Sequence, residues 1–327
     1  MASNPDRLRR MSSGSSCLLC RLAGRRLVRL SGVLLLPMAL VALAGCAGLA
    51  AWGPMLQSGV IESEAINLTQ QMQPNMENHS DADGPLFTGQ YAPTDPLADD
   101  LIVVSYNLRY GEELAAMMEA YRRDAPLPAA DIILLQEMDE VGVAAVAREL
   151  GYNYVYYPAS VAEDGDNFGN AILARWPISD PAKLILPGQH PLTGQQRTAT
   201  RATVSVNGDP ILVYSTHIEV ATAPPALRAK QFAAIVDDIP ADAARVIVGG
   251  DFNTVTNLGV EALAGQFAAA GLSHDTAALG PTFTRFGLRP SATDHIFTRG
   301  LERLDAGVLD GVTASDHFPV WGLYALP

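Results

Sequence analysis

Short apolar runs that each end in polar residues restrict this chain to a fold built on buried strands. The clearest run, Val246-Ile247-Val248, leads directly into Gly249-Gly250-Asp251-Phe252-Asn253. Four further segments of this kind place polar residues at similar points, namely Asn107, Gln136-Glu137, His217 and Asp316-His317. Because the carboxyl ends of strands usually carry the chemistry of open α/β sheets, we expect these side chains to meet in one pocket.

The residue types in these segments indicate metal-assisted activation of water. A single Asp after a strand is usually a turn or capping residue, but five such segments in one chain outweigh that interpretation. The chain has no Gly-x-Ser-x-Gly motif and no phosphate-binding loop that ends in Gly-Lys-Ser/Thr. All three cysteines lie within the first 46 residues. Carboxylates, amides and histidines remain, and such a set suits Mg²⁺ or Mn²⁺.

The hydrophobic periods predict more strands than helices, and some strands follow one another without a crossover helix. Mixed sheets with helices outside therefore fit better than a doubly wound parallel sheet. We expect helices over 113–123, 141–150, 225–238 and 258–270. The strands are expected over 101–107, 131–136, 152–157, 170–175, 200–206, 211–217, 245–249, 293–298, 301–309 and 320–325.

The order of the motifs resembles that of the endonuclease/exonuclease/phosphatase superfamily, whose fold is that of pancreatic deoxyribonuclease. The motifs are Ser-Tyr-Asn-Leu-Arg, Leu-Leu-Gln-Glu, Gly-Asn-Ala-Ile-Leu, Ser-Thr-His, Gly-Gly-Asp-Phe-Asn, Asp-His-Ile-Phe and Ser-Asp-His-Phe-Pro. The match runs from about Leu101 to Leu326. It implies an α/β (α+β) four-layer sandwich, with two packed mixed β-sheets flanked by helices, as a catalytic domain over residues 99–327.

Metal-ligand and general-base roles can be assigned to five of these residues. Glu137 is expected to be the principal metal ligand, since a carboxylate at the rim of an apolar cleft needs a compensating cation. Asn107 would orient Glu137 or join it at the metal, and Asp316 would bind the metal or orient the water. Asp251 is expected to be the general base, and Asn253 would fix the water or the phosphate without adding charge.

Two histidines are candidates to donate hydrogen bonds to phosphate oxygens. His217 and His317 suit this role because imidazole can carry a proton near neutral pH. Asp294 would hold the ring of His317 and raise its basicity. His295 is expected only to pack, and His79, His190 and His274 stand in no motif and are expected at the surface.

Three more residues are candidates for substrate binding. Asn170 in Phe168-Gly169-Asn170 matches the phosphate-side asparagine of the family. Arg197 and Arg201 flank the start of a predicted strand, and one of them could contact a substrate phosphate bidentately. The alternative for both is a solvated arginine at a strand edge.

The first 46 residues resemble an export signal. A basic stretch precedes the apolar run from Leu30 to Trp52, which contains Leu43-Ala44-Gly45-Cys46. This motif resembles the lipobox of bacterial lipoproteins and favours lipidation at Cys46. An uncleaved membrane anchor is the main alternative, because about 20 apolar residues suffice to span a bilayer. Either interpretation predicts a membrane-anchored, extracytoplasmic protein.

Residues 47–98 contain six acidic residues and no Lys or Arg, and we expect a flexible tether there. Without its first 45 residues the chain has 15 basic and 34 acidic residues, a net charge of −19. Such a charge repels polyanions at long range. Nucleic acid is therefore not the favoured partner, and we expect a monomer that acts on a phosphoester substrate.

The leading functional hypothesis is a membrane-tethered, metal-dependent phosphoesterase in which water attacks phosphorus in line. The substrate would be a lipid headgroup, a small phosphoester or nucleic acid. The first alternative is an extracytoplasmic endo- or exonuclease. The alternative of another class is a non-catalytic binding lipoprotein on the same fold, which loss of a metal ligand or base would favour.

Overall fold

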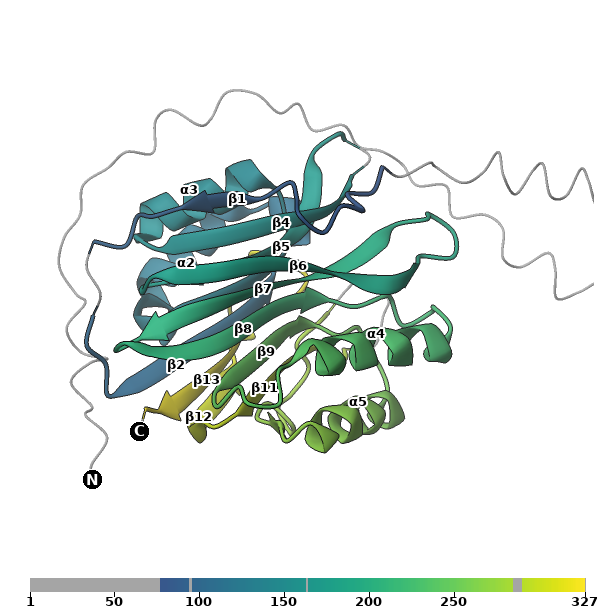
Figure 1. Ribbon diagram of the computed structural model, residues 1–327. Coiled ribbons are helices and arrows are strands. Elements are labelled where there is room, and N and C mark those ends of the chain that lie inside the picture. The colour runs from purple at the N-terminus through teal and green to yellow at the C-terminus, as the bar shows by residue number, and fades with distance from the viewer. Residues whose placement is uncertain (1–76, 94–95, 163, 285–289, 327) are drawn as a thin grey trace, which may run out of the picture. The chain divides into compact units, whose positions relative to one another are not determined.

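Two β-sheets pack face to face and form the centre of the molecule (Figure 1). The structure, a computed structural model, describes residues 77–93, 96–162, 164–284 and 290–326. The expected signal or anchor and the first part of the expected tether lie outside these residues. No helix of the described residues is long and apolar enough to cross a membrane.

The first sheet has seven strands in the order β1-β4-β5-β3-β2-β13-β12. Only β2 and β3 pair in parallel, and their neighbours in the sheet are antiparallel. The strands are β1 (Phe87–Gly89), β2 (Asp100–Asn107), β3 (Ile132–Met138), β4 (Asn153–Val161), β5 (Asn167–Ala174), β12 (Glu302–Val308) and β13 (Val320–Ala325).

The second sheet has six strands in the order β10-β11-β9-β8-β7-β6. Its one parallel pair is β8 with β9, so each sheet contains a single parallel pair among antiparallel strands. The strands are β6 (Ile178–Gln189), β7 (Gln196–Val206), β8 (Asp209–His217), β9 (Val246–Asp251), β10 (Ser273–His274) and β11 (Asp294–Arg299). The expected mixed sheets are confirmed.

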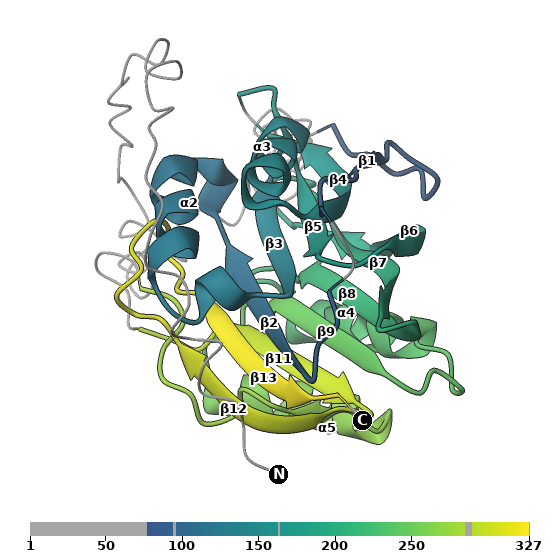
Figure 2. The same cartoon turned by 90° about the vertical axis from the view of Figure 1, so that its left-hand side faces the viewer.

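Three hydrophobic clusters separate four layers, as the expected sandwich requires. One lies between the first sheet and its helices, one between the two sheets, and one between the second sheet and its helices. Figure 2 shows α2 and α3 on the outer side of β2 and β3. The α-helices are α2 (Leu114–Arg123), α3 (Glu140–Leu150), α4 (Pro225–Asp238) and α5 (Asn257–Ala269), with short 3₁₀ turns at η3 (Arg109–Gly111) and η4 (Leu127–Ala129).

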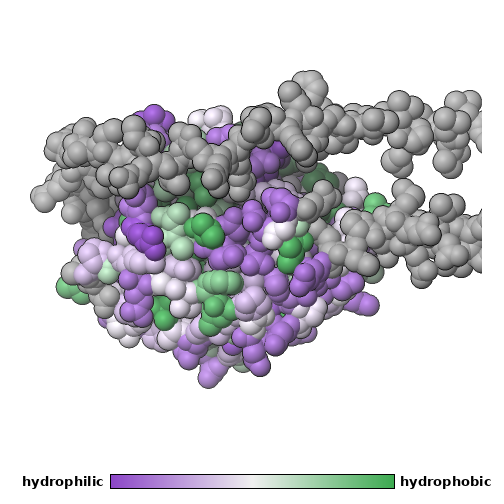
Figure 3. Space-filling model, turned by 90° about the horizontal axis from the view of Figure 1, so that it is seen from above, coloured by the Kyte–Doolittle hydropathy of each residue, from purple (hydrophilic) through white to green (hydrophobic). Residues whose placement is uncertain are grey.

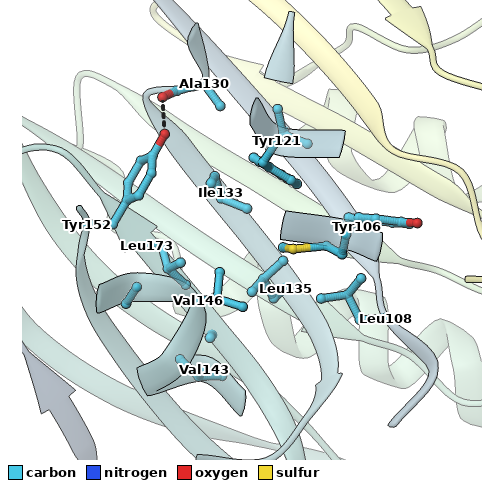
Figure 4. Close-up of a cluster of buried hydrophobic side chains, with 14 of the residues drawn as sticks. Tyr106, Leu108, Tyr121, Ala130, Ile133, Leu135, Val143, Val146, Tyr152 and Leu173 are labelled. Atoms are coloured by element: carbon cyan, nitrogen blue, oxygen red, sulfur yellow. Dashed lines mark hydrogen bonds between the residues drawn. The ribbon is translucent and has the colours of Figure 1, made fainter. Parts of the chain in front are cut away.

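In the hydrophobic cluster between the first sheet and its helices, alternate residues of a strand pack against one face of a helix. Ile133 and Leu135 alternate along β3 and face Val143 and Val146 of α3 (Figure 4). Asp139 accepts a hydrogen bond from the backbone of Gly142 and caps α3, while Gly151 ends it in a left-handed conformation. The packing of α3 on the sheet thus fixes the segment that follows Glu137 at the carboxyl end of β3.

The expected tether extends less far along the chain than the sequence suggested. Residues 77–93 and 96–98 pack on the domain, and β1 pairs with β4. The side chain of Lys183 is buried and donates to the backbone oxygens of His79 and Gly84. The acidic, unperiodic composition concealed this packing, because these contacts reach about 100 residues along the chain.

Strand β6 is the one long strand that the hydrophobic pattern did not predict. Its pairing with β7 shifts register twice, between Ser179 and Ala182 and between Ile185 and Gln189. Pro181 and Pro187 lie in the strand, and proline is tolerated mainly at sheet edges and bulges.

On the face seen in Figure 3, hydrophilic residues surround small separate groups of apolar ones.

Candidate active site

The carboxyl ends of the two parallel strand pairs lie against each other and carry most of the expected site residues. In the first sheet Asn107 of β2 pairs with Gln136 of β3, one residue before Glu137. In the second sheet His217 of β8 pairs with Asp251 of β9. We call the end of the sandwich that carries these residues the site edge. Neighbouring strands therefore supply an amide, two carboxylates and an imidazole at one place.

Asp251 occupies the centre of this group. Its Oδ2 accepts from Asn107 Nδ2 at 3.1 Å and lies 3.5 Å from His217 Nε2 and 3.7 Å from His317 Nε2. Its Oδ1 accepts from the backbone N–H of Asn253 at 2.8 Å. Phe252 between them points into the core, and Asn253, just past the end of β9 with a φ of 49°, turns back to bond Asp251 and His217.

Glu137 reaches the site because β3 is irregular at its end. The register with β5 shifts between Leu135 and Met138, and Glu137 has a φ of 57°. Such a bulge turns a side chain away from its regular direction, and a left-handed non-glycine residue stores strain that often marks a functional site. Glu137 Oε1 then accepts from Asn107 Nδ2 at 3.0 Å.

Burial dominates the electrostatics of both carboxylates. It raises the pKa of Asp251 to about 7, an effect that His317 opposes and Asp294 reinforces. Burial also raises the pKa of Glu137, against the hydrogen bond from Asn107. A carboxyl group whose pKa lies near neutrality is suited to exchange a proton during a reaction.

His317 is held as a cation. Its Nδ1 lies 2.8 Å from Asp294 Oδ2, which also accepts from the hydroxyls of Thr282 and Thr293. Burial alone would lower the pKa of His317, but the charges of Asp294 and Asp251 outweigh burial and raise it to about 10. The expected pairing of Asp294 with His317 is present in the structure.

His217 differs from the expectation that it carries a proton. Arg197 Nη1 lies 3.2 Å from its Nδ1, and Asn253 Nδ2 lies 3.1 Å from its Nε2. Burial lowers the pKa of His217 well below its ordinary value, and the Arg197 charge lowers it further. The ring is therefore neutral in this arrangement, and N–H donors face both of its nitrogens.

Arg197 is part of the wall of the site, whereas Arg201 is not. The guanidinium of Arg197 is buried, lies 5.7 Å from the ring centre of Phe168, and is 3.6 Å from Glu219, whose side chain is fully buried. Arg201, four residues further along β7, bonds Asp238 at the end of α4. The prediction that one of the two arginines contacts a substrate phosphate stays a prediction, and Arg197 is the better placed of the two because Asp238 binds Nη1 of Arg201.

Two asparagines also use their donors within the protein. Asn170 is buried and donates from Nδ2 to the backbone oxygen of Thr198 at 2.8 Å, so it fixes β5 to β7. Asn253 donates from Nδ2 to the backbone oxygen of Ile218 at 3.0 Å. In this arrangement the amide nitrogens of both residues hold neighbouring backbone, and contact of Asn170 with a phosphate stays a prediction.

A cation fits the donor set between the sheets. Glu137, His217 and Asp251 form one group of ligand atoms within 4.8 Å of one another, and Asp251, Asp294 and His317 form a second. The two buried carboxylates of the first group have raised pKa values, and a cation would relieve their burial cost. The second group already holds the charged His317. The first group is therefore the better candidate metal centre.

Of the other expected ligands, Asn107 does not turn its oxygen to this centre. Its Nδ2 faces Glu137 and Asp251, while its Oδ1 accepts from the backbone N–H of Arg109. It therefore orients the carboxylates and is not placed as a ligand. Asp316 is partly exposed, lies 3.9 Å from Arg109 Nε, and adds to the rise in the pKa of Glu137. A cavity of about 290 Å³ adjoins Asp316 and Arg109.

The sequence did not reveal that buried histidines support the segment after β9, which contains Asn253 and Thr254. His295 is buried, its Nε2 lies 2.7 Å from the hydroxyl of Thr254, and its Nδ1 lies 3.1 Å from His274. Burial lowers the pKa of His295 to about 3 and that of His274 to about 4, so both rings are neutral. His274 is thus partly buried and not a plain surface residue. No pattern in the sequence predicted the two-residue strand β10 that contains His274.

The family profile described as Endonuclease/Exonuclease/phosphatase family matches residues 104–317. The chain belongs to this family. Its members are hydrolases of phosphoester bonds and generally use a divalent metal ion. No match was found among curated protein sequences.

Solved structures of the family share the fold at low sequence identity. An endonuclease/exonuclease/phosphatase from Beutenbergia cavernae is 18% identical, with a TM-score of 0.55 over 70% of this chain and 72% of that one. D. rerio TDP2 complexed with single strand DNA product is 20% identical, with a TM-score of 0.55 over 70% and 100%. The Bacteroides thetaiotaomicron mannosyl-6-phosphatase Bt3783 is 20% identical, with a TM-score of 0.54 over 69% and 100%.

Proposed function

We propose that this chain is a divalent-metal-dependent phosphoester hydrolase in which Asp251 takes the proton from the attacking water. The observation that carries the proposal is the position of Asp251 Oδ2, which lies within 3.7 Å of Asn107, His217 and His317. A buried carboxyl whose pKa is near 7 can accept that proton at neutral pH. No covalent nucleophile is needed, and water attacks phosphorus in line.

Mg²⁺ or Mn²⁺ would be held by Glu137 together with Asp316, whose charge already acts on Glu137, and Asp251 is left to act as the base. When bound, such an ion neutralises the charge that develops on the phosphoryl oxygens. The chain's own contribution is orientation, since Asn107 fixes both Glu137 and Asp251 through one amide nitrogen. This arrangement keeps the base directed at the water while the ligand faces the ion.

His317 supplies the positive side of the site. Its ring is tied through Nδ1 to Asp294, so its Nε2 N–H faces Asp251 Oδ2 at 3.7 Å, where the phosphoryl group would bind. A charged donor there stabilises the oxygens of a phosphoryl group as they gain charge in the transition state. The neutral His217 adds no charge of its own, and the second positive charge in the wall is that of Arg197 beside it.

The favoured substrates are a lipid headgroup or a small phosphoester. The net charge of −19 without the first 45 residues supports this choice, because it repels a polyanion. Activity on sugar phosphates is supported by the name of the Bacteroides neighbour, and activity on DNA by that of TDP2. An extracytoplasmic nuclease remains the alternative within the class, and a non-catalytic binding protein is the alternative outside it.

The same proposal places the protein at the outer side of a membrane, attached through a lipid on Cys46 or through an uncleaved apolar run. The basis is the sequence from Leu30 to Trp52. Mass spectrometry of membrane-extracted protein distinguishes the two, because lipidation makes Cys46 the first residue. An unmodified N-terminus upstream of Cys46 supports the anchor.

A phosphoester panel with and without Mg²⁺ tests the activity. The chain without residues 1–46 is assayed on phosphomonoesters, phosphodiesters, dispersed phospholipids and single-stranded DNA. We expect turnover of at least one substrate that EDTA abolishes and Mg²⁺ or Mn²⁺ restores. Full activity after exhaustive EDTA treatment would contradict the metal centre, and a preference for DNA would favour the nuclease.

A further inference from the structure

Exposed apolar side chains gather at the edge of the sandwich that carries the site. Among the described residues eight large apolar side chains are exposed, and five of them lie on loops or helix starts at this edge. They are Tyr110, Val141, Leu192, Val255 and Leu258. Single exposed apolar residues are ordinary on soluble proteins, but a gathering of them around one site marks an interaction surface.

These five residues follow the site residues closely in the chain. Tyr110 comes three residues after Asn107, and its ring centre lies 5.2 Å from that of Phe168, which adjoins His217. Val141 lies in the first turn of α3, four residues after Glu137. The chain segments that position the base and the ligand therefore also carry apolar side chains outward.

The other three of these exposed apolar residues lie on the second sheet, and we call the five together the rim. Val255 and Leu258 follow Asn253, and Leu258, 78% exposed, is the second residue of α5. Leu192, 74% exposed, lies in the turn between β6 and β7, just before Arg197. In Figure 1 the β6–β7 hairpin extends past the ends of the neighbouring strands. The rim thus surrounds the site from both sheets.

The described chain begins at this same edge. Asn78 donates to the backbone oxygen of Gly194 and accepts from the backbone N–H of Gln196, both at the base of the β6–β7 turn. The backbone oxygen of Glu77 accepts from Val161 at the end of β4. Only 30 residues separate Glu77 from Cys46, the predicted point of membrane attachment. The chain that comes from the membrane therefore joins the domain beside the site.

We propose that the site edge rests on a lipid bilayer with zwitterionic headgroups and takes its phosphoester substrate from that surface. The inference rests on the proposed hydrolase function and adds where the substrate is presented. Exposed acidic residues at the edge, Glu112, Glu113 and Asp164, oppose an anionic surface. Binding is therefore driven by apolar insertion, as for interfacial segments that bury apolar side chains at the headgroup boundary.

Binding to vesicles tests the surface, with variants matched for the residue removed. Since both sheets and all three hydrophobic clusters lie within residues 77–326, the chain Asn75–Pro327 contains the whole domain and lacks any lipid. The site-edge variant is Leu192→Ser with Leu258→Ser. The control variant is Leu97→Ser with Leu304→Ser, two exposed leucines away from the site edge.

We expect the unaltered domain and the control variant to float with phosphatidylcholine vesicles, and the site-edge variant to bind at least about 10-fold more weakly. All three should hydrolyse a water-soluble phosphoester at the same rate. The inference fails if the unaltered domain does not bind these vesicles, if it binds only anionic ones, or if both variants lose binding equally. It also fails if sedimentation shows a dimer that only the site-edge variant dissociates. Vesicle binding without hydrolysis of any soluble phosphoester would instead contradict the proposed function.

Discussion

Residues with positive φ occur at both ends of the sandwich, in a hairpin turn at one end and at the site at the other. At the end away from the site, Asn207 and Gly208 both have positive φ and form the tight turn between β7 and β8. The side chain of Asn207 there binds both the N–H and the oxygen of Ala98. At the site edge Glu137 and Asn253 adopt similar φ values outside any hairpin turn.

The difference shows where buried polar groups have favourable partners and where they are held at a cost in stability. Asn207 sits in a turn that favours its conformation, and its polar atoms have partners. Glu137 and Asp251 are carboxyl groups whose charged forms burial disfavours, so the pKa of each is raised. The hydrophobic clusters and turns such as Asn207-Gly208 therefore stabilise the domain, whereas the buried carboxyl groups at the site edge lower its stability.

The largest expected effect concerns Asp251 and Glu137. Asp251→Asn should keep the fold but lower the turnover by about 10²–10⁴, because the amide cannot accept a proton. Glu137→Gln should lose activity through weaker metal affinity, so high Mg²⁺ should restore part of it. The measurement is kcat as a function of Mg²⁺ concentration, with circular dichroism as the check of folding. If both variants respond equally to added Mg²⁺, the separation of base and ligand is wrong.

A smaller effect should separate the two arginines of β7. Arg197→Lys keeps a charge beside Glu219 but cannot reproduce the planar contact with His217 and Phe168, and we expect activity to fall by about 10–100-fold, as for other residues that orient a site. Arg201→Lys is the matched control and should leave kcat nearly unchanged. Steady-state kinetics on one substrate decide the matter. Equal losses in both variants would mean that β7 packing and not His217 is affected.

The smallest effect should separate the two asparagines. Asn207→Ala forces alanine into a left-handed conformation and removes two hydrogen bonds, so we expect a loss of unfolding free energy of about 1–3 kcal/mol with normal kcat. Asn253→Ala should cost similar stability and also reduce activity, because its neighbours are Asp251 and His217. Urea unfolding and kinetics on the same samples test this. A drop in kcat for Asn207→Ala would remove the contrast between the two ends.

Much of the fold could be predicted because its strands are locally encoded. The apolar runs before Asn107, Glu137, His217 and Asp251 form buried strands, as their composition predicts. The polar residues at the ends of these strands identify the site. The structure brings these residues together with Asp294 and His317. Strand alternation was sufficient for this part because it fixes both the end of a strand and the side that it faces.

The remaining features depend on contacts that no local pattern encodes. The partner of Arg201 is Asp238, 37 residues away, and that of Lys183 is the backbone near His79, about 100 residues away. The charge state of His217 depends on how deeply Arg197 is buried beside it. The sequence indicates which side chains meet, while their protonation and the use of their donors follow from packing between distant segments.

The packed segment before β2 also has a mechanical consequence. It starts at the site edge beside Gly194, runs along β4 as β1, and is tied to Asn207 at the other end before β2 begins. A pull on residue 77 from a membrane is therefore met first by the bonds of Asn78 and by the two that Lys183 donates. These bonds lie along the flank of the domain, at the β6–β7 turn and at Lys183, and none of them involves Asn107. In a domain attached through its N-terminal segment, as proposed above, the first bonds to bear load would be those at Gly194 and Gln196, next to Arg197 in the wall of the site.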